Sequence, residues 1–326
     1  MWQGRDLTPL RGAPGLVRLL GHRGARGIMP ENTLEGFLYA LLAGVDILEL
    51  DVLVTADRVP VITHNPQLSP DMTRDASGNW LAGEAPSVAA LSFDELQRYD
   101  TGSLRTGSDY AALFGEQSVL HQVRIPKLAD LCALLARPGR GDVWLNVEIK
   151  SNPLHPADTL PADDLVAAVL AALASGEMLQ RSLLQSFDWQ VLEAAGRQAP
   201  LLPRSFLSRL PGPEVAGTIY PGSPWMAGRA LAKAGGSLPR LVQAADGQIW
   251  SPYFADLSEA DLAEARALGL IVYVWTVNET PDIERMISLG VDGIITDYPA
   301  RVQRALQARG QAWSEDISAS PIRRFA

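Results

Sequence analysis

The chain has 326 residues, of which 47% are hydrophobic and 20% are charged, as is typical of a globular protein. Its formal net charge of −9 does not favour nucleic acid as a partner, and its single cysteine excludes an intramolecular disulfide framework. No signal peptide opens the sequence and no stretch approaches the ~20 apolar residues of a membrane span, so we expect a cytoplasmic protein.

Short apolar runs of strand length alternate with longer helix-like patterns along the whole chain. The expected strands are residues 16–20, 46–54, 143–149, 182–187, 201–207, 248–253, 270–277 and 292–297. The expected helices are residues 33–43, 127–136, 162–174, 189–198, 258–268, 280–289 and 300–309. This alternation predicts one (β/α)8 TIM barrel over residues 16–310. An open doubly wound sheet is the alternative, but the glycines of "GHRGARG" lack the G-x-G-x-x-G spacing of a dinucleotide-binding turn.

Two segments interrupt the alternation and a third follows it. Residues 66–125 separate the second strand from its helix and are rich in Pro, Ser, Gly and Asp, so they predict a small insertion subdomain with a helix at "SFDELQRY". Residues 209–247 predict a second insertion, part loop and part helix. Residues 311–326 are the predicted C-terminal tail.

Acidic side chains occur at the ends of two expected strands. Glu49 and Asp51 are two positions apart in "ILELDVLV" and therefore face the same side, and Glu148 and Lys150 repeat this spacing in "NVEIK". Because the carboxyl ends of barrel strands meet at one mouth, three carboxylates would gather there and suit a divalent cation with oxygen ligands. Solvated charges at strand edges are the alternative, but both runs are otherwise apolar.

Two histidines lie beside these carboxylates. His22 and Arg23 end the first expected strand, and His64 follows "VPVIT", which we expect to extend the second strand as a hairpin. Two imidazoles suit a phosphodiester cleavage in which one group takes a proton from the nucleophile and another protonates the departing alkoxide. Arg23 and Lys150 are expected to bind phosphate oxygens. Trp275 either fills the barrel or lines a pocket over an apolar part of the substrate.

Seven motifs occur in the order of a known family over about residues 18–300. They are "GHRGARGIMPENTLEGF", "ELDVLVTADRVPVITHN", "IPKLADL", "NVEIK", "QSF", "VYVWTVN" and "DGIITDYP". With these motifs the sequence resembles the glycerophosphodiester phosphodiesterases. The resemblance implies a barrel, a divalent cation (Mg²⁺ or Ca²⁺), and cleavage of glycerophosphodiesters to glycerol 3-phosphate and an alcohol. Two departures are Asn65, where the family often has Asp, and "TDYP" in place of "TNRP" or "TDRP".

The resemblance also implies roles for individual residues. It implies an acid/base pair at His22 and His64, metal binding by Glu49, Asp51 and Glu148, phosphate contacts from Arg23 and Lys150, and a substrate-side aromatic at Trp275. Glu31 either serves the metal, directly or through a neighbour, or only favours the helix N-terminus that Asn32 is expected to cap. Residues 66–125 match the family's insertion, which we expect to cover the barrel mouth and select the alcohol.

Two other functions stay open at this point. A phospholipase D-like or lysophospholipid-cleaving relative would need an apolar ramp, which aromatic and aliphatic residues of the two insertions could build. Those residues are Trp80, Leu81, Tyr110, Phe114, Tyr220, Trp225 and Met226. A non-enzymatic binding protein would be expected to lack a catalytic histidine or a metal carboxylate, and none is missing. The expected partner is a small-molecule substrate; the alcohol, the native metal and the oligomeric state are not specified by the sequence.

Overall fold

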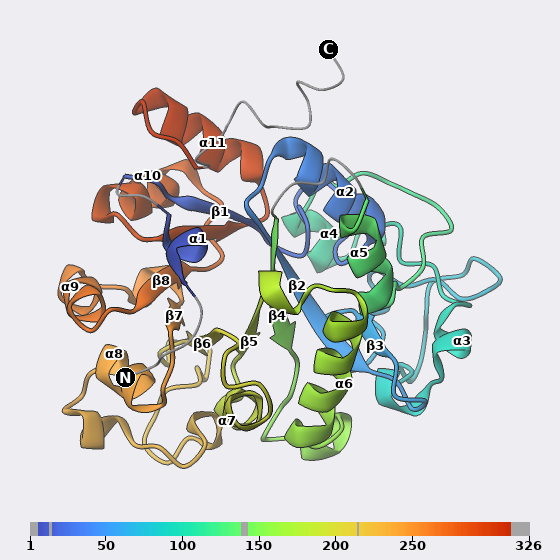
Figure 1. The fold of residues 1–326 in the computed structure, drawn as a ribbon. Helices are drawn as coiled ribbons and strands as arrows, with labels where there is room; N and C mark the ends of the chain where they lie inside the picture. Colours follow the sequence, from blue (N-terminus) through green and yellow to red (C-terminus); the bar gives the residue numbers. More distant parts are fainter. Residues whose placement is uncertain (1–5, 13–14, 138–142, 214, 314–326) are drawn as a thin grey trace.

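The computed structural model describes residues 6–12, 15–137, 143–213 and 215–313, and in them eight parallel strands close into a barrel (Figure 1). The strands are β1 (Arg18–Gly21), β2 (Ile47–Val54), β4 (Trp144–Ile149), β5 (Ser182–Ser186), β6 (Arg204–Ser208), β7 (Ile249–Pro252), β8 (Ile271–Val274) and β9 (Gly293–Thr296). Their order is β1-β9-β8-β7-β6-β5-β4-β2, and pairing of β1 with β2 closes the circle. The predicted TIM barrel is confirmed, and the open sheet is excluded.

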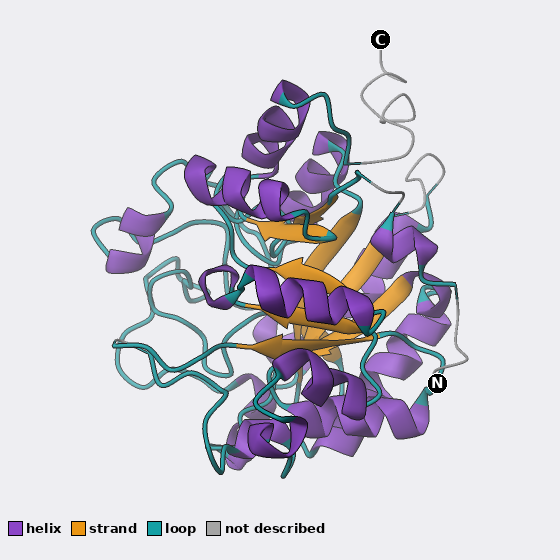
Figure 2. Ribbon diagram, turned by 90° about the vertical axis from the view of Figure 1, so that its left-hand side faces the viewer, coloured by secondary structure: helices purple, strands orange, loops and turns teal. Residues whose placement is uncertain are grey.

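Helices surround the barrel strands (Figure 2). They are α2 (Leu34–Ala43), α5 (Leu128–Leu135), α6 (Ala162–Ser175), α7 (Trp189–Gln198), α8 (Leu238–Ala244), α9 (Glu259–Ala267), α10 (Thr280–Leu289) and α11 (Pro299–Ala308). All but α8 match the helices expected from the sequence, and α8 lies in the second insertion. The helices pack on outward-facing strand residues such as Leu48 and Leu50, which are fully buried. None of the helices in the described ranges is long and apolar enough to span a membrane.

The short helix α1 (Thr8–Arg11) closes the N-terminal end of the barrel. Its Leu10 is fully buried in a cluster with Leu20, Ile47 and Ile271, which point into the barrel near the strand starts. The hydroxyl of Tyr273 donates a hydrogen bond of 2.6 Å to the Leu10 carbonyl oxygen. One end of the barrel interior is therefore filled with apolar side chains, so polar chemistry is confined to the opposite, C-terminal end.

The first insertion follows β3 (Pro60–Ile62), which pairs with β2 as the predicted antiparallel hairpin. Residues 66–125 contain α3 (Phe93–Leu96), within the expected helix at "SFDELQRY", and α4 (Asp109–Leu113). They share a small apolar core with the hairpin, made of Leu53, Val61, Leu68, Val88, Leu96 and Ile125. The limits proposed for this subdomain and for the barrel stay predictions, and residues 314–326 of the predicted tail lie outside the described residues.

Six short 3-10 helices complete the described elements. They are η1 (Val88–Ala90), η2 (Pro156–Asp158), η3 (Leu179–Arg181), η4 (Pro224–Met226), η5 (Leu231–Ala234) and η6 (Phe254–Asp256). Two of them, η4 and η5, precede α8 in the second insertion, so this segment is part loop and part helix as expected.

Candidate active site

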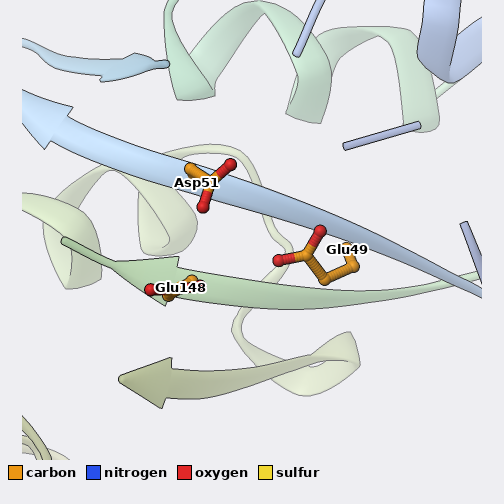
Figure 3. Close-up of side chains that lie close together, drawn as sticks. All are labelled: Glu49, Asp51 and Glu148. Carbon is orange, nitrogen blue, oxygen red and sulfur yellow. The ribbon is translucent and has the colours of Figure 1, made fainter. Parts of the chain in front are cut away.

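Three carboxylates meet inside the C-terminal end of the barrel (Figure 3). Glu49 and Asp51 come from β2, and Glu148 comes from the neighbouring β4, where it pairs in register with Asp51. One oxygen from each carboxylate lies within 4.8 Å of the others, and all three side chains are buried. Ile47, Glu49 and Asp51 occupy alternate positions of β2 and therefore share its inward-facing side, which is apolar at Ile47 and acidic at the other two.

The three carboxylates have unequal electrostatic surroundings. Burial raises the pKa of Glu49 well above its usual range, and repulsion from Asp51 and Glu148 raises it further. Burial would also raise the pKa of Asp51, but Arg23 and other positive charges outweigh it and hold that pKa low. The pKa of Glu148 is raised, chiefly by burial, although Lys150 opposes the shift. The cluster therefore carries excess negative charge that its neighbours only partly compensate.

The donor set fits a divalent cation. Asp51 Oδ1 is buried and has no hydrogen-bond partner among the described residues, and Lys150 Nζ lies 3.6 Å from it. Buried polar oxygens are rarely left unsatisfied, so this atom calls for a further partner. Three oxygen ligands of carboxylate type at one point are what Mg²⁺ and Ca²⁺ prefer. The cluster predicted from the sequence is therefore assembled, and its chemistry could hold a metal ion.

His22 lies directly after β1 and faces the carboxylates. Its Nδ1 is 2.7 Å from Asp297 Oδ1, and its Nε2 is 3.9 Å from Glu49 Oε2. Burial lowers the pKa of His22, while the charge of Asp297 acts in the opposite direction. Asp297 itself has a lowered pKa, because His22 and Arg26 outweigh the effect of its burial. Asp297 is ionised and accepts a hydrogen bond from the Nδ1–H of a neutral His22. The lone pair is therefore on Nε2, which points toward the cavity.

Asp297 was not identified as a site residue from the sequence. Its two oxygens accept hydrogen bonds of 2.9 Å each from Arg26 Nε and Nη2, and Asn278 Nδ2 donates to it at 2.7 Å. The available signal was its position after β9, as a carboxylate ending an apolar strand within the motif "DGIITD". Arg26 is 271 residues away in sequence, so no local pattern predicts this pair.

The loop between β1 and α2 has an unusual backbone that aims its side chains. Arg23 (φ 51°), Gly24 (φ 88°) and Asn32 (φ 57°) are all left-handed. A Cβ on Gly24 would lie 2.9 Å from the carbonyl carbon of Gly36, so this tight turn requires glycine. The loop is fixed by an Arg23 backbone amide that donates to Glu49 Oε2 at 2.9 Å.

The expected cap of the first long helix is wrong by one residue. Thr33, not Asn32, caps α2, because the Thr33 side chain accepts a hydrogen bond from the Gly36 amide. Asn32 instead donates from Nδ2 to Asp51 Oδ2 at 2.9 Å, and its Oδ1 accepts from the Asp51 backbone amide at 3.3 Å. Its left-handed backbone conformation and its carboxylate partner make Asn32 a support of the acidic cluster.

Arg23 and Lys150 lie next to the three-carboxylate cluster, as expected from the sequence. Arg23 Nη1 donates to Glu31 Oε1 at 2.7 Å, and Arg23 Nε lies 3.1 Å from Asp51 Oδ2. Lys150 Nζ donates to Glu148 Oε1 at 2.7 Å. Both cations are therefore paired with acids at the rim of the cluster, where an anionic substrate would meet them.

Glu31 lies outside the three-carboxylate cluster and binds Arg23 instead. Its second oxygen accepts a hydrogen bond from the hydroxyl of Tyr110, which also accepts one of 3.2 Å from Arg26 Nη1. The Arg26 guanidinium stacks on the ring of Phe114, 4.4 Å from its centroid. Tyr110 and Phe114 belong to the first insertion, which therefore contacts the loop after β1. The sequence pointed to both residues only as possible parts of an apolar ramp, so their contacts with Glu31 and Arg26 were not predicted.

His64 lies after β3 and lines the same cavity as His22. Its Nδ1 is 2.6 Å from Asn65 Oδ1, so a neutral imidazole donates to Asn65 and leaves Nε2 free. Burial lowers the pKa of His64 well below its usual value, with further lowering by Arg23 and Lys150. Asn65 orients this ring without adding the negative charge that an Asp would supply.

One cavity of about 520 Å³ connects these groups. Its catalytic side is lined by His22, Arg23, His64, Glu49, Glu148 and Lys150. The second insertion also lines it, with Arg209, Val215, Ala216, Gly217 and Trp225. Among the described residues, none of the first insertion at 66–125 lines it. Residues of the first insertion instead line a smaller cavity that shares His64 with this one, so the expectation that the insertion covers the barrel mouth and selects the alcohol stays a prediction.

Trp275 lines this cavity and is one of a group of rings. Its indole Nε1 donates to the Ser251 carbonyl oxygen at 2.9 Å, which fixes the ring plane. Phe187 meets it edge to face at 5.2 Å between centroids, and Tyr253 lies 5.4 Å away. The ring of Phe187 also lies edge to face with that of Trp225, with 6.5 Å between the ring centroids. Trp275 both lines the cavity and packs against the apolar cluster inside the barrel, so its position fits both of the roles expected from the sequence.

Comparison with known proteins gives a consistent family. The model of the "Glycerophosphoryl diester phosphodiesterase family" matches residues 22–301. A glycerophosphodiester phosphodiesterase from Caldanaerobacter subterraneus is 29% identical over 86% of this chain and 94% of its own length. The crystal structure of a glycerophosphoryl diester phosphodiesterase homologue from Silicibacter pomeroyi is 46% identical, with a TM-score of 0.84 over 94% of this chain and 99% of that chain.

A more distant crystal structure shares the fold and contains a bound product. It is a phosphodiesterase from Oleispira antarctica in complex with sn-glycerol-3-phosphate, 21% identical, with a TM-score of 0.64 over 90% of this chain and 97% of that chain. At this identity the likeness supports the barrel alone.

Proposed function

The chain belongs to the glycerophosphoryl diester phosphodiesterase family, and on this premise we propose that it cleaves glycerophosphodiesters to glycerol 3-phosphate and an alcohol, with His22 and His64 as acid/base pair. The observation that carries the proposal is that both imidazoles line one cavity together with Glu49 and Glu148. The choice of product rests on membership of this family.

His22 is the better placed base. Its Nδ1–H donates a hydrogen bond to Asp297, so the unprotonated Nε2 can accept a proton from the attacking nucleophile. The imidazolium that forms is stabilised by the Asp297 carboxylate at 2.7 Å, much as a buried aspartate stabilises the histidine of a hydrolase triad. Arg26 and Asn278 hold that carboxylate from the other side.

His64 then serves as the acid that protonates the departing alkoxide. Burial and the positive charges of Arg23 and Lys150 disfavour its protonated form. A phosphodiester anion bound between these cations offsets their charge, which favours protonation of His64 when substrate is present. The Nδ1 contact with Asn65 fixes the ring so that Nε2 carries the transferable proton.

Glu49, Asp51 and Glu148 would hold the divalent cation, Mg²⁺ or Ca²⁺. When bound there, such a cation supplies Lewis-acid stabilisation of the negative charge that develops on the phosphate oxygens. Arg23 and Lys150 contribute to the same end, Arg23 through two parallel N–H donors and Lys150 as a compact charge. Asn32 and Glu31 hold Asp51 and Arg23 in position through the contacts described above.

A substrate screen tests the proposal directly. Purified protein with Mg²⁺ or Ca²⁺ should release glycerol 3-phosphate from at least one of glycerophosphocholine, glycerophosphoethanolamine and glycerophosphoinositol. Product should be measured by a coupled glycerol-3-phosphate dehydrogenase assay and confirmed by mass spectrometry. Release of the alcohol phosphate with free glycerol would show that the bond on the other side of phosphorus is cleaved, and would contradict the proposed products.

A lysophospholipid substrate is a second candidate, favoured by one observation. Leu154, Val215 and Ala216 present apolar groups to the cavity beside Trp225, and Leu154 is 53% exposed. Of the ramp residues expected from the sequence, Trp225 is the one that lines this cavity. Adding lysophosphatidylcholine to the same screen, with choline release as the readout, separates this activity from the first. The cytoplasmic location expected from the sequence stays a prediction.

The Tyr110 hydroxyl is predicted to support turnover from the first insertion. It joins Glu31, the partner of Arg23, to Arg26, the partner of Asp297. Tyr110→Phe removes this bridge but keeps the ring that packs on Phe114. Loss of a hydrogen bond to a charged group costs about 1.5–3 kcal/mol, so kcat/KM should fall by roughly 10- to 100-fold with the melting temperature little changed.

Tyr99→Phe in the same insertion is the matched control, since that ring packs against the insertion's apolar core and its hydroxyl makes no hydrogen bond to Glu31 or Arg26 among the described residues. Combining Tyr110→Phe with Glu31→Gln should cost much less than the product of the two single effects, because both break one chain of contacts. Strictly multiplicative effects in the double variant, or a Tyr110→Phe enzyme as active as the wild type, would show that the bridge does not position Arg23.

A further inference from the structure

The part of the cavity lining that comes from the second insertion carries a cation without a salt bridge among the described residues. Arg209 follows β6 and lines the cavity beside Trp225. The other cations of this cavity, Arg23, Arg26 and Lys150, form ion pairs with buried carboxylates. Arg209 makes no salt bridge within the described ranges of the chain. The carboxylate of Asp256, which its charge influences, accepts a hydrogen bond from the Leu210 amide instead.

Arg209 is held in place by its backbone and by a ring. Its backbone amide donates to Thr218 Oγ1 at 3.2 Å, and its carbonyl oxygen accepts from the Thr218 and Ile219 amides at 2.8 and 3.2 Å. The guanidinium lies over the ring of Tyr253, 4.5 Å from its centroid. Stacking on one face leaves the N–H donors at the edge of the guanidinium plane free, and these donors bind oxyanions in pairs.

Two aromatic rings in this part of the site have cations of the protein over them, whereas no cation lies over Trp225 or Trp275 among the described residues. Arg209 covers Tyr253, and Lys150 Nζ lies 5.9 Å from the centroid of Phe187. A quaternary ammonium group such as choline is recognised by free aromatic faces. On Tyr253 and Phe187 it would share the face with a like charge, and the Arg209 guanidinium would repel a cationic alcohol bound beside it.

We propose that Arg209 forms a subsite for an oxyanion carried by the alcohol portion of the substrate, so that the enzyme prefers glycerophosphodiesters of acidic alcohols and discriminates against choline. This inference rests on the proposed function, because it concerns the leaving group of the same reaction. The chemical class is an alcohol that carries a phosphate monoester or a free carboxylate, bound by paired N–H donors of Arg209.

Two substrates that differ by one phosphate provide the test. Glycerophosphoinositol and glycerophosphoinositol 4-phosphate share the scissile bond and the ring, so the ratio of their kcat/KM values measures recognition of the added anion. The wild type should favour the 4-phosphate by about 10-fold or more, the usual size of a charge-assisted contact. Glycerophosphocholine should be the poorest of the three, and the preference should shrink as salt is raised.

Substitutions assign the preference to Arg209. Arg209→Ala should reduce the ratio to about one, and Arg209→Lys should restore part of it because a single charge remains. Lys233→Ala is the matched control: it removes one positive charge from an exposed position of the same insertion, away from the cavity, and should leave the ratio unchanged. Melting temperatures of all variants show whether a loss of activity is a loss of folding.

The outcomes separate this inference from the proposed function. Faster cleavage of glycerophosphocholine than of the 4-phosphate, or an unchanged ratio in Arg209→Ala, would overturn the Arg209 subsite while leaving the phosphodiesterase activity established. If no glycerophosphodiester were cleaved, the proposed function would fail. Calorimetric binding of the same two inositol ligands to wild type and Arg209→Ala would then still decide whether Arg209 binds the anion.

Discussion

His22→Ala and His64→Ala are each expected to lower kcat by roughly 10²- to 10⁴-fold, the range typical of losing an acid–base group. The two imidazoles reach the same cavity from different elements, His22 after β1 and His64 after β3, so one cannot take over the proton transfer of the other. His22→Ala should be the more severe change, because it also leaves the buried Asp297 carboxylate without its Nδ1 donor.

The chain offers matched controls for these substitutions. His121 and His155 are the other two histidines, and both are exposed. Alanine at either position should leave kcat unchanged. Single-turnover rates and circular dichroism should be recorded for all four variants, so that slow chemistry is distinguished from misfolding. Near-wild-type turnover of His22→Ala or His64→Ala on every active substrate would show that the histidine concerned does not transfer a proton.

The pH dependence of kcat/KM should identify His22 as the base. Burial holds the pKa of His22 below its usual value, so its Nε2 stays available as a base down to a pH lower than that of an exposed histidine. Loss of the base form therefore sets the acidic limb of kcat/KM at unusually low pH. Asp297→Asn removes the carboxylate that favours the imidazolium, and should move this limb to still lower pH while it lowers the maximum rate.

Much of the site could be predicted because barrel geometry converts sequence spacing into position. Glu49 and Asp51 must share one face of β2, and parallel pairing then sets Glu148 of β4 beside Asp51. The hairpin that carries His64 was also predicted, because "VPVIT" is a short apolar run that follows the second strand closely enough to pair with it. Strand period and strand order together determine these contacts without any information on side-chain partners.

The contacts that were missed depend on loops, where no period applies. Thr33 and Asn32 are both good capping residues, and only the left-handed conformation at Asn32 decides that its side chain turns to Asp51. Tyr110 reaches Glu31 from 79 residues away through an irregular insertion. Likewise, the amino-acid composition of the two insertions could not show which of them lines the cavity that contains both histidines, because that depends on how each insertion packs against the barrel.

Removal of divalent cations is expected to abolish activity, and the charge of the cluster gives the reason. Glu49, Asp51 and Glu148 lie within 4.8 Å of one another at the place where a phosphodiester anion must bind. At about 5 Å and an effective dielectric constant of ~20, each like-charge pair costs roughly 3 kcal/mol. Arg23 and Lys150 compensate part of this charge, yet Asp51 Oδ1 is still without a hydrogen-bond partner in the described structure.

Binding can be measured without turnover. Mg²⁺ or Ca²⁺ at about 100 times its dissociation constant should stabilise the folded protein by ~2.7 kcal/mol, which corresponds to a rise in melting temperature of several degrees. Chelation should reverse that rise and stop product release, and readdition of the cation should restore both. Glu148→Gln should weaken the thermal response to the cation and lower activity, while the barrel stays folded.

Glu49→Gln gives the sharpest form of this test, because its two effects have opposite signs. The substitution removes a carboxylate whose ionisation burial and two neighbouring acids oppose, so the cation-free protein should melt at the same temperature or higher. With cation present it should melt lower than the wild type, since one ligand is lost. Glu259→Gln, at an exposed position of α9, should change neither value. Full turnover in protein shown by elemental analysis to be metal-free, together with a Glu49→Gln melting curve that responds to Mg²⁺ and Ca²⁺ as the wild type does, would mean that the three carboxylates do not hold a cation.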